Sequence, residues 1–371
     1  NWAVNSNYRA GIDADVAALT EAMSNGQVGA VLIHGVNPVY ELYNGKKFAE
    51  GLKKVPVTVS FADRMDETAQ QCKFVVPNHH YLESWGDAEP KTGYYSLMQP
   101  GIAPLFKTRA YQDSLLMWAG ATTTYGDMWK QYWTSKLGGE SNFDKALQDC
   151  IVEPAGDMPT GGATFAGNIG AAISAIPAKP TDGMEVVIYE KISIGHGGMW
   201  SNNPWLHEMP DPMTKVTWDN YACVSPKKAK ELDNELTSIT EVDTAKRVIK
   251  LKVNGQEVML PLIAVPGMHN DVVAIAVGYG RDAKVGMAAK SGTDKWGNEI
   301  GGKNVYPLTH MVGQTVSYFA PVTIEKTDKT YDLAITQTHM SSEGRAVVHE
   351  FTLEEFAKNP NELLEERKEE I

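Results

Sequence analysis

The residues with the clearest potential for chemistry are three carboxylates in one short segment: Glu83, Asp87 and Glu89 surround Trp85. Paired carboxylates can perform general acid–base chemistry when burial or a close partner raises one pKa. The sequence identifies no such partner. An aromatic residue among charged neighbours is instead typical of the centre and rim of an interface. We therefore predict that Glu83, Trp85, Asp87 and Glu89 form a partner interface, and that no residue of the chain is catalytic.

Two glycine-rich stretches are candidates for contact with a phosphate or another cofactor group. Gly195 and Gly197 follow one strand-like run, while Gly278 and Gly280 follow another and precede Arg281. Backbone N–H groups can cradle a phosphate, and a guanidinium can bind one through two parallel hydrogen bonds. The first stretch lacks the helix and lysine that follow in a phosphate-binding loop. A flexible loop and a tight turn with a surface arginine are the alternative interpretations.

Histidine and cysteine do not suggest a metal site. His79 and His80 are adjacent, and adjacent side chains on an extended strand point in opposite directions, so both cannot readily face one metal. The three cysteines, Cys72, Cys150 and Cys223, include no C-x-x-C pair. A cysteine-ligated iron–sulfur cluster usually needs four thiolates. We expect neither a metal ion nor a cluster in this chain.

Composition restricts the classes of partner. The 371 residues carry a formal net charge of -12, whereas nucleic-acid binding rewards clustered Lys and Arg, so we expect no nucleic acid. The longest weakly polar run, Thr164 to Ala178, contains Asn168 and Pro177. A membrane span needs about 18 or more apolar residues, so no direct span is expected. Because the chain begins at Asn1, we interpret it as a processed or excised product.

The elements that position these residues change in type near residue 150. In residues 1–150, the short apolar runs Gly29–His34, Val55–Phe61 and Lys73–Pro77 alternate with helix-like segments. This βαβαβ rhythm favours a Rossmann-like parallel sheet covered by helices. The expected helices are one starting at Asp13, one from Pro38 to about Lys53, a short one from Asp66, and then Ala110–Trp118 and Tyr125–Leu137.

The second half of the chain is richer in β-structure. Residues 151–180 contain many Gly, Pro and Ala and are expected to form a linker or long loop. Residues 181–352 contain short β-rich runs separated by Gly and Asn turns, the pattern of a small barrel or sandwich. Residues 353–371 form an acidic tail that we expect to be helical. The predicted strands are Glu185–Ile194, Val248–Val253, Glu257–Val265 and Val272–Val277.

Short phrases in the first half resemble the molybdopterin oxidoreductases. A strand of that family ends in Val-Val-Leu-Pro and precedes a Glu-x-x-Gly-x segment. Here Phe74-Val-Val-Pro77 precedes Tyr81-Leu-Glu83 and Gly86-Asp87. Upstream, Glu67-Thr-Ala69 fits the family's Asp-x-x-x-x-Glu-Thr-Ala phrase, and Gly35-Val-Asn-Pro38 fits its Gly-x-Asn-Pro turn. The phrases occur in the family's order.

Longer phrases are similar to one subgroup, the molybdopterin oxidoreductase-like iron–sulfur subunit of the respiratory assembly called alternative complex III. They are Leu82–Phe106, Asp113–Leu116 and Thr338–Arg345. The resemblance implies a molybdoenzyme-like half followed by a ferredoxin-like half with iron–sulfur clusters, and this chain corresponds to the later part of the first half. It also implies that the β-domain is a molybdopterin-dinucleotide-binding-type barrel, with Gly278–Arg281 in a late loop near the dinucleotide.

As a function, the resemblance implies a non-catalytic scaffold. A working molybdoenzyme of this type has an early cluster-binding or related segment and a Ser, Cys, selenocysteine or Asp metal ligand, and no such early region is present here. The subunit of alternative complex III is understood, as a family, to have lost the cofactor. We therefore expect no cofactor in this chain, no molybdopterin, and iron–sulfur clusters in a C-terminal part outside it.

The resemblance also implies partners and a place in the cell. The partners would be other subunits of a membrane respiratory complex, including a multihaem cytochrome and quinol-oxidising membrane subunits. The place would be the periplasmic side of the bacterial inner membrane. Two alternatives stay open: a fragment of an active molybdenum bis-pterin oxidoreductase, and a free-standing binding protein of the same fold.

Overall fold

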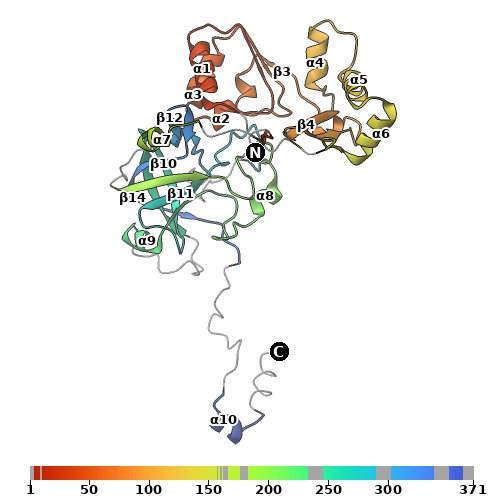
Figure 1. Ribbon diagram of the computed structural model, residues 1–371. Coiled ribbons are helices and arrows are strands. Elements are labelled where there is room, and N and C mark those ends of the chain that lie inside the picture. The colour runs from red at the N-terminus through yellow and green to blue at the C-terminus, as the bar shows by residue number, and fades with distance from the viewer. Residues whose placement is uncertain are drawn as a thin grey trace.

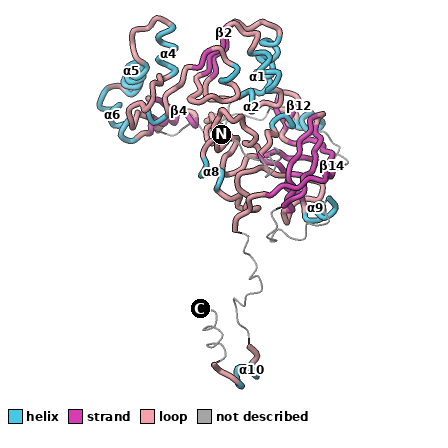
Figure 2. Tube along the Cα trace, turned by 180° about the vertical axis from the view of Figure 1, so that it is seen from behind, coloured by secondary structure: helices cyan, strands magenta, loops and turns pink. Residues whose placement is uncertain are grey.

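The computed structural model shows three packed units, which Figure 1 and Figure 2 present from opposite sides. In both views an α/β unit lies between a smaller unit with helices α4 to α6 and a β-barrel. The structure describes residues 4–8, 11–156, 158, 161, 166–175, 183–232, 245–289, 302–337 and 351–361.

The α/β unit is built on a parallel three-stranded sheet, which confirms the parallel sheet predicted for this part of the chain. The sheet order is β1-β2-β3, and both pairs of neighbours are parallel. Apolar side chains of the sheet and helices form a buried core of Met23, Val31, Ile33, Phe48, Leu52 and Val55. The elements are α1 (Asp13–Ser24), β1 (Ala30–Ile33), α2 (Pro38–Glu41), α3 (Gly45–Leu52), β2 (Val57–Ser60), η1 (Ala69–Gln71) and β3 (Phe74–Val75).

Two predicted helices differ from the structure. The helix expected from Pro38 to about Lys53 is divided into α2 and α3, because Leu42 has an extended backbone. The tight turn brings Gly45 against α2, where a Cβ would lie 2.2 Å from the carbonyl oxygen of Val39. The helix expected from Asp66 is reduced to the single turn η1.

The second unit combines an antiparallel sheet with three helices. Its buried core contains Leu97, Trp129, Trp133, Phe143 and Ala146. The acidic segment expected to be a loop is a strand from Gly86 onward, and the linker expected from residue 151 begins as an edge strand paired with β5. The elements are η2 (Tyr81–Glu83), β4 (Gly86–Lys91), β5 (Tyr94–Met98), α4 (Tyr111–Trp118), α5 (Tyr125–Leu137), α6 (Glu140–Asp149) and β6 (Ile151–Val152).

The mainly β domain is a six-stranded closed barrel. The strand order is β10-β8-β11-β7-β14-β9, and β9 pairs with β10 to complete the ring. Four of the strands correspond to the predicted β-rich runs, whereas β8 and β14 were not predicted. The bounds are β7 (Met184–Tyr189), β8 (Ala222–Val224), β9 (Ala245–Val253), β10 (Gln256–Ala264), β11 (Val272–Ala276) and β14 (Phe319–Asp332).

Shorter elements complete the described chain. The predicted linker contains α7, and the predicted helical tail contains α10, whereas the phrase Thr338–Arg345 and the tail beyond residue 361 lie outside the described residues. Within the described ranges, no helix has the length and apolar character needed to cross a membrane. The bounds are α7 (Ile169–Ala175), α8 (Pro204–Glu208), α9 (Pro226–Leu232), η3 (Tyr306–Leu308), β12 (His310–Val312), β13 (Thr315–Ser317) and α10 (Leu353–Lys358).

Candidate functional site

The two glycine-rich stretches meet at one junction between the barrel and the α/β unit. They follow β7 and β11, which are parallel neighbours, so both loops leave the same end of the barrel. A Cβ on Gly197 would lie 2.6 Å from the Cα of Gly278. A Cβ on Gly278 would lie 2.9 Å from the carbonyl oxygen of Gly195. Glycine is therefore needed here so that the two backbones can approach each other.

The other two glycines of the junction differ in how closely they are packed. Gly280 has a φ of 68°, and a Cβ there would lie 2.1 Å from the backbone nitrogen of Asn304. Gly195 has more space, but the nearest atom to its Cβ position is a carboxylate oxygen of Glu190, 3.9 Å away. Backbone atoms therefore lie close to Gly280, and a carboxylate lies near Gly195.

Arg281 lies in this junction, and each of its three guanidinium nitrogens donates a hydrogen bond. Its Nε and Nη2 each donate to an oxygen of Glu67 at 2.9 Å, and its Nη1 donates to the carbonyl oxygen of Gly197. The guanidinium also lies 4.1 Å from the ring centroid of Tyr40. The two parallel hydrogen bonds predicted for a phosphate are thus made with a carboxylate of the same chain.

Glu67 is held from three sides. Besides Arg281, it accepts a hydrogen bond from the backbone of Asp282 at 2.9 Å and one from the side chain of Asn37 at 2.7 Å. Burial by itself would raise the pKa of Glu67, but the hydrogen bonds and charge of Arg281 outweigh it and hold this pKa below its usual value. Glu67 is therefore an ionised partner of a buried cation.

The same contacts explain two of the sequence phrases that carried the resemblance. Asn37 belongs to the Gly-x-Asn-Pro turn, and Thr68 belongs to the Glu-Thr-Ala phrase. The backbone and hydroxyl of Thr68 donate to the side-chain oxygen of Asn37 at 3.1 and 2.6 Å. Sequence reasoning did not select Asn37 or Glu67 as site residues, although both lie within these phrases.

Two tyrosines extend the junction across the unit boundary. The hydroxyl of Tyr40 donates to the carbonyl oxygen of Tyr279 at 2.6 Å, and that of Tyr306 donates to the carbonyl oxygen of His196 at 3.0 Å. The rings of Tyr40 and Tyr306 make an edge contact at 5.4 Å. Burial raises the pKa of both hydroxyls well above the usual value, so they remain neutral hydrogen-bond donors.

The junction therefore holds the α/β unit against the barrel. Its hydrogen bonds and ring contacts join residues 37–68 to residues 196–306, and they use the guanidinium and both phenols. The predicted cofactor-binding residues Gly195, Gly197, Gly278, Gly280 and Arg281 are thus brought together, and the guanidinium of Arg281 is paired with Glu67. A phosphate could use the same Nε and Nη2 edge of Arg281 only by displacing Glu67.

The predicted interface segment is arranged differently. Glu83 is not on the rim of an exposed loop, because its side chain is only 4% exposed. Its oxygens accept hydrogen bonds from the backbone of Leu105 and of His80, each at 2.9 Å. These bonds lower the pKa of Glu83, with the contact from Leu105 the largest cause. Glu83 connects the turn η2 to the segment near Leu105.

Trp85 and Asp87 both contact helix α5. The half-buried ring of Trp85 lies 5.2 Å from the ring of Trp129, and the ammonium of Lys130 lies 4.5 Å from it. One oxygen of Asp87 accepts hydrogen bonds from the indole nitrogens of Trp129 and Trp133, both at 2.7 Å. These contacts hold Trp85 and strand β4 against helix α5.

Glu89 and the adjacent histidines also have partners within the chain. Glu89 accepts a hydrogen bond from the backbone of Gly93 at 2.7 Å and so closes the turn between β4 and β5. His79 contacts the hydroxyl of Thr108 at 2.7 Å, and His80 caps η2. Among the described residues, no group of three or more His, Cys, Asp and Glu is placed to hold a metal. A docking role for the segment remains a prediction, centred on the exposed part of Trp85.

Comparisons with known proteins place these observations in context. No protein-family model matches the sequence. Over 119 residues, or 30% of this chain, the sequence is 36% identical to the menaquinone reductase, molybdopterin-binding-like subunit of Nitratidesulfovibrio vulgaris. This match spans 17% of that protein.

The fold is similar to that of acetylene hydratase from Pelobacter acetylenicus. The TM-score is 0.50 with 16% sequence identity, and the likeness covers 84% of this chain and 46% of that chain. At this identity the comparison shows a shared fold alone. The sequence similarity thus concerns part of one molybdopterin-binding-like subunit, and the structural similarity concerns the fold.

Proposed function

We propose that this chain is a non-catalytic scaffold within a respiratory quinol-oxidising complex of the alternative complex III type. In this proposal, the parallel sheet and barrel descend from the Rossmann-like and dinucleotide-binding parts of a molybdopterin oxidoreductase. Electron transfer runs through iron–sulfur clusters outside the chain. The observation that carries the proposal is the ion pair between Arg281 and Glu67.

The ion pair supports a scaffold because it uses the guanidinium that a cofactor phosphate would need. Displacing Glu67 would leave its carboxylate close to a phosphate in a partly buried place, and an unpaired buried charge costs several kcal/mol. The glycines next to Arg281 serve close backbone packing. The contacts at the junction are those of an interface between two packed units. We infer that no pterin dinucleotide binds there.

The similarity to a subunit of a menaquinone reductase supports the proposed partners. By analogy, we infer that the chain assembles with other subunits of a membrane respiratory complex, including a multihaem cytochrome and quinol-oxidising membrane subunits. The complex would lie on the periplasmic side of the bacterial inner membrane. The net charge of -12 is compatible with basic partner surfaces.

The direct test is the metal content of the purified chain. We expect elemental analysis to find neither molybdenum nor iron in stoichiometric amount, because the glycine junction is closed and the three cysteines are too few for a cluster. Near-stoichiometric molybdenum would contradict the proposal and favour a fragment of an active bis-pterin oxidoreductase. A metal-free chain that does not co-purify with respiratory subunits would instead favour a free-standing binding protein.

Replacement of Trp85 tests the proposed docking surface. Trp85→Ala is expected to weaken assembly with neighbouring subunits by about 2 kcal/mol or more, as for an aromatic residue at an interface centre. Glu83→Gln is expected to change quinol oxidation only slightly, because Glu83 accepts hydrogen bonds from the backbone of His80 and Leu105. Both are measured in the rebuilt complex, as subunit affinity and turnover.

The matched control is Trp205→Ala, since Trp205 is 80% exposed and belongs to helix α8, outside the unit that contains β4. It should leave assembly through the β4 segment unchanged. Because Trp85 also packs on Trp129, the substitution could destabilise the isolated chain. Thermal unfolding of each isolated variant measures that effect, so that a loss of assembly can be attributed to docking. Full assembly with Trp85→Ala, together with lost turnover for Glu83→Gln, would refute the docking role.

A further inference from the structure

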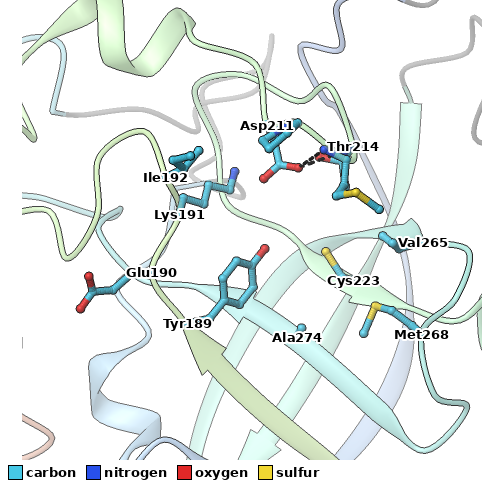
Figure 3. A pocket seen from close by; sticks show the side chains of 12 residues that line it. Tyr189, Glu190, Lys191, Ile192, Asp211, Thr214, Cys223, Val265, Met268 and Ala274 are labelled. Atoms are coloured by element: carbon cyan, nitrogen blue, oxygen red, sulfur yellow. Dashed lines mark hydrogen bonds between the residues drawn. The ribbon is translucent and has the colours of Figure 1, made fainter.

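A cavity of about 330 Å³ begins at the end of β7, and its lining residue Glu190 also lies near Gly195 of the glycine junction. Figure 3 shows its wall formed by apolar side chains that include Val265, Met268 and Ala274. The segment Asp211–Thr214 lies across the cavity from the end of β7. The volume is at the lower end of the range for small-molecule pockets, which are mostly apolar with few polar groups.

A lysine supplies the strongest polar group of this cavity. Lys191 is 5% exposed, and its ammonium donates to the carbonyl oxygen of Asp219 at 3.0 Å. The ammonium also lies 4.2 Å from the ring of Tyr221 and 5.0 Å from that of Tyr279. An ammonium has three N–H donors. Within the described part of the chain, the carbonyl of Asp219 is its hydrogen-bond acceptor, so donors remain for a ligand.

The charges around Lys191 determine which ligand suits it. Figure 3 shows the carboxylate of Asp211 facing the amine across the cavity. Burial lowers the pKa of Lys191 to about 8, while the nearby charges of Asp211 and Asp219 oppose this shift. Burial also raises the pKa of the Cys223 thiol to about 12, so that group stays neutral. At neutral pH the ammonium of Lys191 thus already faces the negative charge of Asp211. An uncharged acceptor adds no second negative charge to the cavity.

We propose that this cavity binds a small, mainly apolar carbonyl compound whose oxygen accepts a hydrogen bond from the Lys191 ammonium. The apolar wall removes the body of the ligand from water. The carbonyl oxygen supplies the acceptor that the buried ammonium lacks. A carboxylate ligand is disfavoured by the like charge of Asp211.

The first test measures binding of acetophenone to the full chain by ligand-observed NMR. Lys191→Met keeps the length of the side chain and removes its donors, and it is expected to weaken binding roughly tenfold, the effect of losing one hydrogen bond to a charged group. Lys228→Met is the matched control, because Lys228 pairs with Glu231 on helix α9 and should leave binding unchanged. Equal binding by wild type and Lys191→Met would overturn the proposal.

A second test does not depend on the lysine variant folding. Benzaldehyde with cyanoborohydride traps an amine that reaches the aldehyde: the neutral nitrogen bonds to the carbonyl carbon, water leaves as the imine forms, and hydride reduces the imine to a secondary amine while cyanoborohydride is oxidised. Peptide mapping should find Lys191 labelled ahead of surface lysines and protected by acetophenone. Ala274→Leu, which fills the cavity, should abolish this preference. Labelling of Lys191 no sooner than surface lysines, or without protection, would refute the site.

Discussion

Glu67→Ala is expected to lower the free energy of unfolding by about 3–5 kcal/mol, the range for removing one partner of a buried ion pair. The variant would leave the guanidinium of Arg281 buried, with the carbonyl oxygen of Gly197 and the ring of Tyr40 as its remaining partners. It would also remove the acceptor for the backbone of Asp282. Unfolding in denaturant, followed by fluorescence, measures the effect.

Matched variants distinguish the effect of breaking the buried ion pair from the effect of losing a surface charge. Glu50→Ala removes half of an exposed pair with Lys53 and should change stability by less than about 1 kcal/mol. Arg281→Met and the double variant complete a cycle, in which the coupling between residues 67 and 281 should be well above 1 kcal/mol. A coupling near zero would mean that the junction is not held by this pair.

The pH dependence of stability provides an independent reading of the same pair. The pKa of Glu67 is lowered in the folded chain, so its contribution is fully present above the unfolded value of about 4.3 and is lost as the pH falls through the lowered folded value. The stability difference between wild type and Glu67→Gln should therefore shrink as the solution is acidified below about pH 4. A constant difference across this range would show that Glu67 is not the titrating group.

Trp133→Ala is expected to destabilise the unit of helices α4 to α6 by about 3–5 kcal/mol, as for other buried tryptophan truncations. Trp133 is 1% exposed, its ring makes an edge contact with Tyr95 at 5.2 Å, and its indole nitrogen donates to Asp87. Its loss would leave a large void and remove one of the two donors to Asp87. Hydrogen exchange of the α5 and α6 amides and the unfolding midpoint both report the change.

An exposed tryptophan provides the control for this substitution. Trp205→Ala removes the same side-chain volume at a position that is 80% exposed and should change stability by less than about 0.5 kcal/mol. The barrel amides should exchange at the wild-type rate in Trp133→Ala if the effect is confined to its own unit. Similar effects of the two substitutions would mean that the core around Trp133 is not close-packed.

The fold class could be predicted because it depends on local patterns. Short apolar runs separated by helix-like segments indicate a parallel sheet, and β-rich runs between Gly and Asn turns indicate a small barrel or sandwich. The structure contains the parallel sheet as β1 to β3, and of the two β-architectures it contains the barrel, as a ring of six strands. The strand β8 was missed because Ala222–Val224 is only three residues long, too short for a period to be recognised.

The acidic segment shows where local reasoning fails. Glu83, Asp87 and Glu89 have the composition of an exposed loop, yet each carboxylate accepts hydrogen bonds within the chain. The donors for Asp87 are tryptophans 42 and 46 residues further along. Spacing within the segment carries no information about such donors, because they are brought close only when α5 packs against β4.

By itself, the sequence determined the parallel sheet, the β-rich second half and the positions of the glycine stretches after two of its strands. Only the tertiary structure decided what those stretches do. Arg281 and Glu67 are 214 residues apart, so their pairing leaves no periodic trace in the sequence. It follows from the packing of one unit on the other, which places a carboxylate in the position where a phosphate was predicted.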